Sequence, residues 1–358
     1  MEEMEIDSLK LQNFWKDKKV FLTGHTGFKG SWISLWLQIL GADVKGYSLK
    51  PQSDPSLFSE AKIAEGMHSF IGDVRDLDKL SKEVISFKPE IVIHMAAQPL
   101  VRESYIDPIN TYSTNVIGTA NLLEACRKCS SIKAVLNITT DKCYENYELD
   151  KEYKEDDRLG GHDPYSSSKA CSELVTSAYK KSFFLDTDIS IATARAGNVI
   201  GGGDWSEDRL LPDIIKSFTN SEKVLIRYPN AIRPWQHVLE SISGYLRLAQ
   251  RLYEYGHKYS ESWNFGPYKT DTQTVEYIVN KMVKLWGNNS SWELDESSNP
   301  YEAGYLKLDI TKSQELLAWK PKWNLDEALE KVVKWHMEWL KTSDARSICI
   351  NQIKDYSK

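Results

Sequence analysis

A glycine-rich segment set directly between an apolar strand-like run and an apolar helical run constrains the fold of this chain more than any other feature. The segment, residues 24–30 (GHTGFKG), follows KVFLTG and opens a helix, ISLWLQIL, that runs to Gly41. Glycines at such a turn let the backbone bend sharply and approach a pyrophosphate, and the first N–H groups of the helix point at the negative charge. This order predicts a dinucleotide site, with a purely structural glycine turn as the alternative.

Strand-like runs alternate with helix-length segments through the first two-thirds of the chain, which predicts βαβ units and a parallel sheet. The helix between the fourth and fifth runs is expected over 110–129. The six runs are KVFLTG, DVKGYSL, HSFIGDV, EIVIHMAA, KAVLNITT and DISIATARAGNV. Together with the glycine segment, this pattern predicts a doubly wound α/β sheet of the Rossmann type.

After about residue 200 the chain becomes richer in Trp, Pro and Tyr, as in GGGDWSEDR and RYPNAIRPWQ. We therefore expect a dinucleotide-binding domain over 1–200, to which some later segments return, and a mainly substrate-binding α/β portion over 201–358. An amphipathic helix is expected over 323–340, where its aromatic stripe serves packing.

Charge and hydropathy favour a small-molecule partner. The 358 residues carry a formal net charge of -6 and no dense Lys/Arg stripe, which argues against nucleic acid or an anionic membrane surface. The first ten residues, MEEMEIDSLK, are unlike a signal peptide, and no apolar run approaches 18 residues. A cytoplasmic protein without membrane partners is expected.

The five cysteines suit a reducing compartment. Cys126 and Cys129 form a CxxC, but they lie on a predicted helix without a second pair of ligands. We interpret them as ordinary thiols and expect no metal site.

The ends of the second and third strands bear on the choice of dinucleotide. An acidic residue after the second strand would hold the adenosine ribose, yet 46–50 reads GYSLK, so both NAD and NADP stay open. Asp73, followed by Val74, comes after the third strand, where a carboxylate can bond the adenine amino group. The alternative is that Asp73 caps the following turn.

A Tyr and a Lys four residues apart share one helix face, where the ammonium can lower the Tyr pKa and hold the nicotinamide ribose. The chain has three such pairs, Tyr147/Lys151, Tyr165/Lys169 and Tyr277/Lys281. Tyr165/Lys169 is favoured, because it opens a helix after Asp163-Pro164, about 25 residues past the fifth strand. The other two are interpreted as surface residues.

Thr140, Asp141 and Lys142 follow the fifth strand. Active sites of open α/β sheets lie beyond the carboxyl ends of their strands, which places these three beside Tyr165. Such a set offers more proton-transfer chemistry than an alcohol dehydrogenase needs. The alternative is a capped turn with a solvated Asp-Lys pair.

With GHTGFKG, HMAAQ, TTDK, YSSSK and RAGNVIGGGDW in one order, nearly the whole chain resembles the extended short-chain dehydrogenase/reductase family. Asp-Lys after the fifth strand, with RPWQHVLE, is similar to the branch that dehydrates CDP-glucose, whereas relatives acting on other nucleotide sugars typically carry Asp-Glu. The resemblance implies NAD, a CDP-glucose substrate and a homodimer. It leaves a 4-epimerase or another sugar oxidoreductase as an alternative, and a non-catalytic dinucleotide sensor as a remote one.

The resemblance also implies roles for individual residues. Cofactor contacts fall on Gly24, Thr26, Gly27, Phe28, Gly30, Asp73, Val74, Ala96, Ala97, Gln98 and Asn115, the last of which orders the site. The catalytic set is Thr140, Asp141, Lys142, Tyr165 and Lys169, in which Asp141 is a general acid and Lys142 replaces the usual Glu, as a C5 base or as a cation that stabilises an enolate. Substrate contacts fall on Asn198, Arg209, Arg233 and His237, each with an ordinary polar loop residue as its alternative.

Overall fold

The computed structural model describes residues 11–287, 290–297 and 304–358. The acidic segment 1–10, whose composition is unlike a signal peptide, lies outside the described residues. Within the described ranges, no helix is both long and apolar enough to cross a membrane. The cytoplasmic location stays a prediction.

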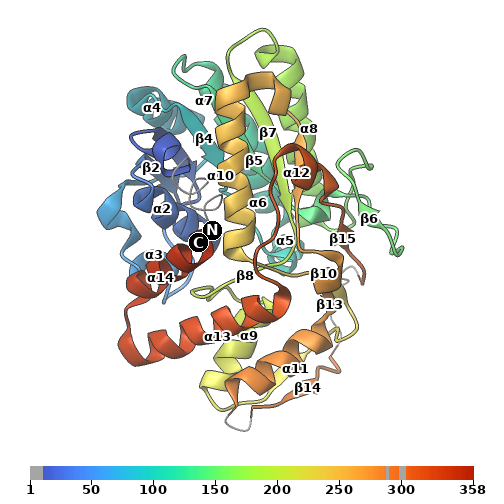
Figure 1. Cartoon of the computed structure of the whole chain (residues 1–358). Coiled ribbons are helices and arrows are strands. Elements are labelled where there is room, and N and C mark those ends of the chain that lie inside the picture. The colour runs from blue at the N-terminus through green and yellow to red at the C-terminus, as the bar shows by residue number, and fades with distance from the viewer. Residues whose placement is uncertain (1–10, 288–289, 298–303) are drawn as a thin grey trace.

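Seven parallel strands form the central sheet, in the order β12-β7-β5-β4-β1-β2-β3 (Figure 1). All six predicted runs form strands of this sheet, and β12 adds a seventh from beyond residue 200. The strands are β1 (Lys19–Thr23), β2 (Asp43–Ser48), β3 (His68–Ile71), β4 (Ile91–His94), β5 (Ala134–Ile138), β7 (Ser190–Ala196) and β12 (Ser262–Phe265).

The order of the strands reverses at β1, since β2 and β3 lie on one side of it and β4 lies on the other. Ligands of open α/β sheets bind outside the carboxyl ends of the strands at such a switch point. The predicted doubly wound Rossmann fold is therefore confirmed, and its switch point lies where the glycine segment follows β1.

Alternation along the strands directs side chains into two cores. In β1, Val20 and Leu22 pack into one apolar cluster, whereas Phe21 packs into another on the opposite face. Helices α2 and α10 cover the first face, and α4, α7 and α8 cover the second. Their bounds are α2 (Phe28–Ile39), α4 (Leu77–Phe87), α7 (Gly118–Arg127), α8 (Pro164–Tyr179) and α10 (Val238–Tyr255).

The helix predicted over 110–129 forms with one irregularity. Helix α6 (Pro108–Tyr112) continues through a π turn, η2 (Ser113–Ile117), into α7 without a break. Such wide turns are frequent at functional sites. This one carries Asn115, whose side chain is buried.

A third apolar cluster holds a smaller part of the molecule, at the bottom of Figure 1. Its elements are α9 (Leu210–Thr219), β9 (Val224–Ile226), α11 (Val275–Trp286), β14 (Trp292–Leu294) and α13 (Leu325–Thr342). Helix α13 confirms the amphipathic helix expected over 323–340, and a capping box of Asn324 and Glu327 begins it.

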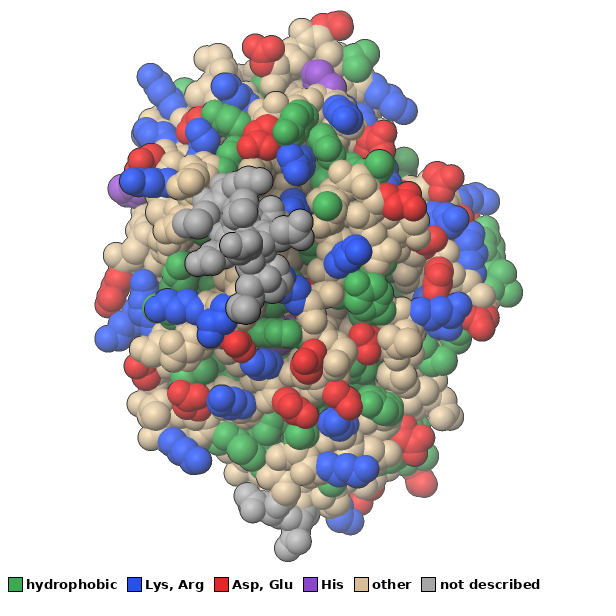
Figure 2. All heavy atoms as spheres, in the orientation of Figure 1, with side chains coloured by type: hydrophobic (Ala, Val, Ile, Leu, Met, Phe, Trp, Pro, Cys, Tyr) green, Lys and Arg blue, Asp and Glu red, His purple; other side chains and the backbone are tan. Residues whose placement is uncertain are grey.

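Segments from beyond residue 200 also return to the main sheet, because β12 pairs with β7 and α10 packs on β5 and β7. The division of the chain at residue 200 stays a prediction. On the face seen in Figure 2, acidic and basic side chains are interspersed.

The remaining elements are short, apart from the C-terminal helix α14. They are α3 (Leu57–Glu60), η1 (Ile63–Gly66), α5 (Val101–Ile106), η3 (Asp141–Cys143), β6 (Glu152–Tyr153), η4 (Lys180–Phe184), β8 (Val199–Ile200), β10 (Ile232–Pro234), β11 (Gln236–His237), η5 (Gly256–Tyr259), η6 (Lys269–Asp271), β13 (Thr272–Thr274), β15 (Lys307–Leu308), α12 (Thr311–Leu316) and α14 (Ala345–Ser357).

Candidate active site

Two glycines of the loop after β1 are required by the protein's own packing. Gly24 has φ +77°, and a Cβ there would lie 2.7 Å from the backbone N of Ala96. A Cβ at Gly30 would lie 2.0 Å from the carbonyl oxygen of Gly24. These contacts bring the loop against the end of β4 and the first turn of α2.

The middle glycine is different. Gly27 is the N-cap of α2 with an ordinary φ of -77°, and a Cβ there would meet only the Gly24 carbonyl oxygen, at 3.5 Å. Gly27 is also exposed. Packing does not explain its missing side chain, whereas close approach of an anionic ligand to the helix N-terminus does.

Hydroxyl groups fix the loop to the strands beside it. Thr23 bonds the Nδ1 atom of His94 at 2.7 Å and accepts from the backbone N–H groups of Met95 and Ala96 at 3.1 Å. Thr26 donates to the carbonyl of Leu49 at 2.8 Å. Phe28, half-buried, lies against Gly201.

The loop after β3 holds Asp73 and Val74 in different environments. The carboxylate of Asp73 accepts hydrogen bonds from the backbone N–H and guanidinium of Arg75 at 2.5–3.0 Å, and these bonds lower its pKa. Val74 is buried, and its carbonyl accepts from Asn121. The hydrogen bond from the Arg75 N–H to the Asp73 carboxylate supports the alternative in which Asp73 caps the turn. Contact of Asp73 with adenine stays a prediction.

Asn115 joins the segment after β4 to α8. Its Nδ2 donates to the Gln98 carbonyl at 3.1 Å and to the Ser168 hydroxyl at 2.8 Å, and its Oδ1 accepts from the Gln98 N–H. Ala96 and Ala97 belong to the same segment, between the end of β4 and Gln98. These bonds hold the loop after β4 to α8, while the cofactor contact implied for Asn115 stays a prediction.

Helix α8 begins as the sequence indicates, with Asp163 as N-cap and Pro164 in its first turn. Tyr165 and Lys169 are both buried on it. The Lys169 Nζ donates to the Ile138 carbonyl at 3.3 Å, at the carboxyl end of β5. Burial lowers the pKa of Lys169 to about 8, a shift that Glu173 opposes.

We expected the Lys169 ammonium to bring the pKa of Tyr165 down. For the protein without a bound ligand, that expectation is wrong. Burial raises that pKa to about 12, because desolvation of the phenolate outweighs the hydrogen bond with Thr140 and the charge of Arg209, which lower it.

The predicted trio after β5 lies beside Tyr165. Thr140 bonds Tyr165 and donates to Asp141 Oδ1 at 3.1 Å. Asp141 is 2% exposed, and burial raises its pKa although the charges of Lys142 and Arg233 lower it. Its Oδ2 is buried and bonds no group within the described part of the chain. A carboxyl oxygen without a hydrogen-bond partner among the described residues is suited to exchanging a proton with a ligand.

A pocket adjoins the trio. Lys142 and Arg233 line it, with Tyr144, Asp163 and Ser166. Lys142, adjacent to Asp141 in the sequence, thus reaches this pocket, and its charge acts on the Asp141 carboxyl group.

Of the four residues expected to contact substrate, the structure brings Arg209 and Arg233 to the cluster, where their charges act on Tyr165 and Asp141. Asn198 is half-buried, and its carbonyl accepts from the Gln236 N–H. His237 lies elsewhere. It is fully buried, caps α10 and packs against Trp32 and Trp323, so its substrate contact stays a prediction.

The other motifs behave as ordinary surface or core features. Lys151 pairs with Asp157, and Tyr277 and Lys281 both bond Asp326 at the surface, as predicted. All five cysteines are free; Cys126 and Cys129 are buried, and burial raises the pKa of Cys126. In the described ranges, no group of three or more His, Cys, Asp or Glu side chains is placed to hold a metal.

Sequence reasoning missed Lys29 and Glu173. Burial, with the charges of Arg209 and Lys169, lowers the pKa of Lys29 to about 7, and its Nζ donates to the Tyr245 hydroxyl at 3.1 Å. Glu173 lies four residues after Lys169 on the same face of α8, so extending the Tyr-x3-Lys spacing by one turn identifies it. Nothing local in the sequence marks Lys29 beyond its place in the glycine loop.

A Rossmann sheet with a dinucleotide-type glycine loop and a buried Tyr-x3-Lys pair beside the end of β5 defines a short-chain dehydrogenase/reductase. The chain belongs to the GDP-mannose 4,6 dehydratase family, whose model matches residues 21–332. It is 55% identical to a CDP-glucose 4,6-dehydratase of Salmonella typhimurium, over 96% of this chain and 98% of that protein.

Solved structures share the fold at lower identity. An epimerase of Methanothermobacter thermautotrophicus aligns with a TM-score of 0.80 at 21% identity, over 94% of this chain and 97% of the other. A dTDP-glucose 4,6-dehydratase of Bacillus anthracis, solved with NAD, aligns with a TM-score of 0.74 at 21% identity, over 90% and 97%.

The contrast between the loop glycines gives a first prediction. Gly30→Ala should destabilise the protein by about 1–3 kcal/mol or more, because its Cβ meets a backbone oxygen. Gly27→Ala should cost under about 1 kcal/mol yet weaken NAD binding at least about tenfold, because its methyl stands where a pyrophosphate would approach. Thermal unfolding and calorimetric NAD titration measure the two effects. Wild-type NAD affinity in Gly27→Ala would contradict the assignment.

Proposed function

We propose that this protein is a CDP-glucose 4,6-dehydratase, which converts CDP-glucose to CDP-4-keto-6-deoxyglucose. The 55% identity to the Salmonella enzyme over almost the whole of both chains carries the proposal. The buried Asp141, placed beside Thr140 and Tyr165, supports a dehydratase in particular, because an epimerase needs no acid there.

NAD is the cofactor we assign. The open space at Gly27 suits its pyrophosphate, and the Lys169 ammonium, at the end of β5, suits the nicotinamide ribose. A dTDP-glucose 4,6-dehydratase of the same fold was solved with NAD. When bound, oxidised nicotinamide supplies the hydride acceptor for C4, the hydride returned to C6, and a positive charge that favours the Tyr165 phenolate.

Tyr165 takes the proton of the C4 hydroxyl, and Thr140 orients that hydroxyl. The C4 ketone acidifies the C5 hydrogen, so water can leave across C5 and C6. Asp141 protonates the departing hydroxyl, for which it must hold a proton; burial, which raises its pKa, favours that state. Lys142 is assigned to C5, as its base or as a cation that stabilises the enolate.

Arg209 and Arg233 are the candidates for the substrate pyrophosphate. A guanidinium donates two parallel hydrogen bonds to a phosphate, which an ammonium does not.

The test is a panel of CDP-, dTDP-, GDP- and UDP-glucose, followed by mass spectrometry. We expect the CDP sugar alone to lose one water efficiently.

Tyr165→Phe should lower turnover at least about 10²-fold, since it removes the proton acceptor, whereas Tyr277→Phe, in a surface pair, should match wild type. Turnover intact in Tyr165→Phe would refute the scheme, and an epimeric product without water loss would favour the epimerase.

A third prediction concerns Lys142. In deuterated water, wild type should place deuterium at C5 of the product, and Lys142→Ala should slow C5 exchange by about 10²-fold or more if the amine is the base. Lys151→Ala, at an exposed lysine that pairs with Asp157, is the control. Exchange at the wild-type rate in Lys142→Ala would exclude Lys142 as the base.

We also propose a homodimer, in which neighbouring helices α6 and α8 meet the same helices of a second copy. Large apolar side chains are exposed on α6 and α8, at the end of α5 and at the end of the π turn η2. They are Ile106, Ile109, Ile117 and Leu174, with exposed fractions of 77%, 76%, 53% and 58%. Exposed apolar groups on adjacent helices are typical of a contact surface, and a two-fold dimer buries both copies of it.

Charges on these helices should therefore weaken the dimer. We expect Ile109→Glu with Leu174→Glu to raise the dimer dissociation constant at least about tenfold, measured by sedimentation. Leu316→Glu, at a side chain of α12 that is 57% exposed, should leave it unchanged. Equal sedimentation of all three proteins as dimers would place the interface elsewhere.

A further inference from the structure

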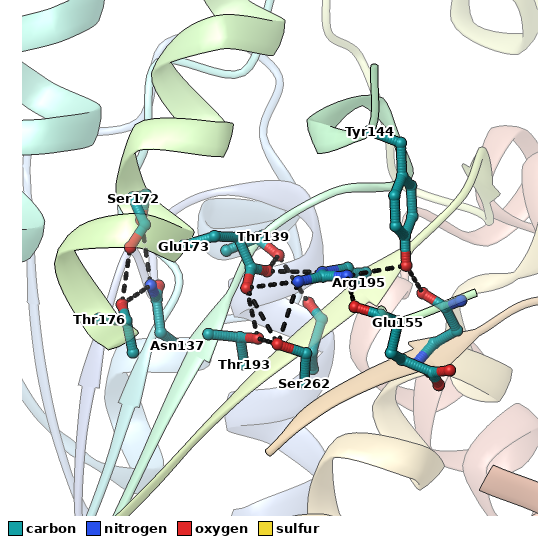
Figure 3. A network of polar contacts seen from close by, with 12 residues as sticks. Asn137, Thr139, Tyr144, Glu155, Ser172, Glu173, Thr176, Thr193, Arg195 and Ser262 are labelled. Carbon is teal, nitrogen blue, oxygen red and sulfur yellow. Dashed lines mark hydrogen bonds and ion pairs between the residues drawn. The ribbon is translucent and has the colours of Figure 1, made fainter. Parts of the chain in front are cut away.

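A buried ion pair lies behind the catalytic cluster. Arg195 of β7 bonds Glu173 of α8 in a two-pronged contact, Nε to Oε1 at 3.0 Å and Nη2 to Oε2 at 2.9 Å (Figure 3). The side chains are 3% and 2% exposed. The Glu173 carboxylate also accepts from the hydroxyls of Thr139 at 2.5 Å and Thr193 at 2.7 Å.

The other side of Arg195 reaches the segment after β5. Its Nη1 donates to the Tyr144 hydroxyl at 2.9 Å and to the Glu155 carbonyl at 3.0 Å. The Tyr144 hydroxyl in turn donates to Asn264 of β12. Figure 3 shows the chain of contacts running from α8 through the sheet to this segment.

Each element held by the pair carries a residue of the candidate site. Thr139 directly precedes Thr140, and Tyr144 follows Lys142 by two positions. Glu173 lies one helical turn after Lys169. At the end of β7, a Cβ on Gly197 would lie 3.1 Å from the Asp141 Oδ2 atom, so Arg195 stands two residues from contact with the acid.

Stability alone is a weak explanation for such a pair. Desolvation of two buried charges offsets much of their attraction, and well-packed apolar side chains are often as stabilising. The pair instead contributes geometric specificity, because the guanidinium group and the carboxylate each hold several hydrogen-bond partners in fixed orientations.

We infer that Glu173 and Arg195 are positioning residues, which hold the segment 139–144 against α8 so that Thr140, Asp141 and Lys169 converge on one substrate. This inference rests on the proposed function for its substrate.

Glu173 also acts on the charge of Lys169. Its carboxylate raises the pKa of Lys169 against burial, and Cys143 acts in the same direction. The Lys169 ammonium in turn lowers the pKa values of His94 of β4 and Lys29 of α2. Without Glu173, the pKa of Lys169 falls below about 8, so the cation is lost at lower pH.

The experiment compares Glu173→Gln with wild type across pH 6 to 9. We expect kcat for CDP-glucose to fall at least about tenfold with KM within about threefold, because misplaced groups slow the chemistry more than binding. The alkaline limb of turnover, and of NAD affinity measured by calorimetry, should move to lower pH. Glu83→Gln, which breaks the remote and largely buried Lys45–Glu83 pair, should leave both profiles unchanged.

The variant Glu173→Leu with Arg195→Met covers the case in which Glu173→Gln does not fold. Removal of both charges should preserve a cooperative thermal transition and still lower kcat at least about tenfold. A folded variant with wild-type kcat and pH profile would overturn the inference, and so would unfolding of both variants, which would assign the pair to fold stability. If wild type dehydrates no nucleotide sugar, the proposed function fails, while the NAD titrations still test Glu173.

Discussion

The parallel direction of the seven strands is the constraint on which the site depends. Because every strand of the sheet points the same way, the residues that follow β1, β4, β5 and β7 all lie along one edge. Gly24, Ala96, Thr140 and Asn198 are far apart in the sequence, yet each stands within a few residues of a strand end at that edge. The contact of Gly24 with Ala96 then joins two of those ends at the switch point.

Burial is the second constraint, and it acts on acids and bases in opposite directions. It raises the pKa values of Asp141 and Tyr165 and lowers that of Lys169, so each group moves towards its neutral form. Burial without polar neighbours would therefore hold all three side chains in their neutral forms. The hydroxyl of Thr140, the carboxylate of Glu173 and the charges of Arg209 and Arg233 counter that effect group by group.

The sequence predicted the features that depend on local pattern. Apolar runs located six strands of the sheet, and Asp163-Pro164 located the start of α8, because period and capping are properties of neighbouring residues. Thr140, Asp141 and Tyr165 were brought together as predicted, since strand ends of a parallel sheet meet. Later segments were expected to return to the sheet domain, but the seventh strand, β12, was not identified, because local pattern assigns its segment to another part of the chain.

Properties set by long-range contacts lay beyond the sequence. The rise of the Tyr165 pKa depends on how fully the side chain is enclosed, and spacing carries no measure of that. The Arg195–Glu173 pair joins β7 to α8, and Lys29 meets Tyr245 across two helices. The packing of His237 against Trp32 and Trp323 is likewise a long-range contact that its sequence context does not reveal.

The placement of Lys142 resolves an apparent conflict in the proposed chemistry. An acid must hold its proton until the hydroxyl leaves, and burial of Asp141 favours that; but a buried carboxylate left behind would be costly. Lys142 and Arg233, whose charges favour its ionised form, flank the neighbouring pocket, so the conjugate base forms beside two cations. A glutamate at position 142 would instead set a second negative charge next to the new one. On this argument the lysine eases proton release from Asp141 whichever of its two roles at C5 it performs.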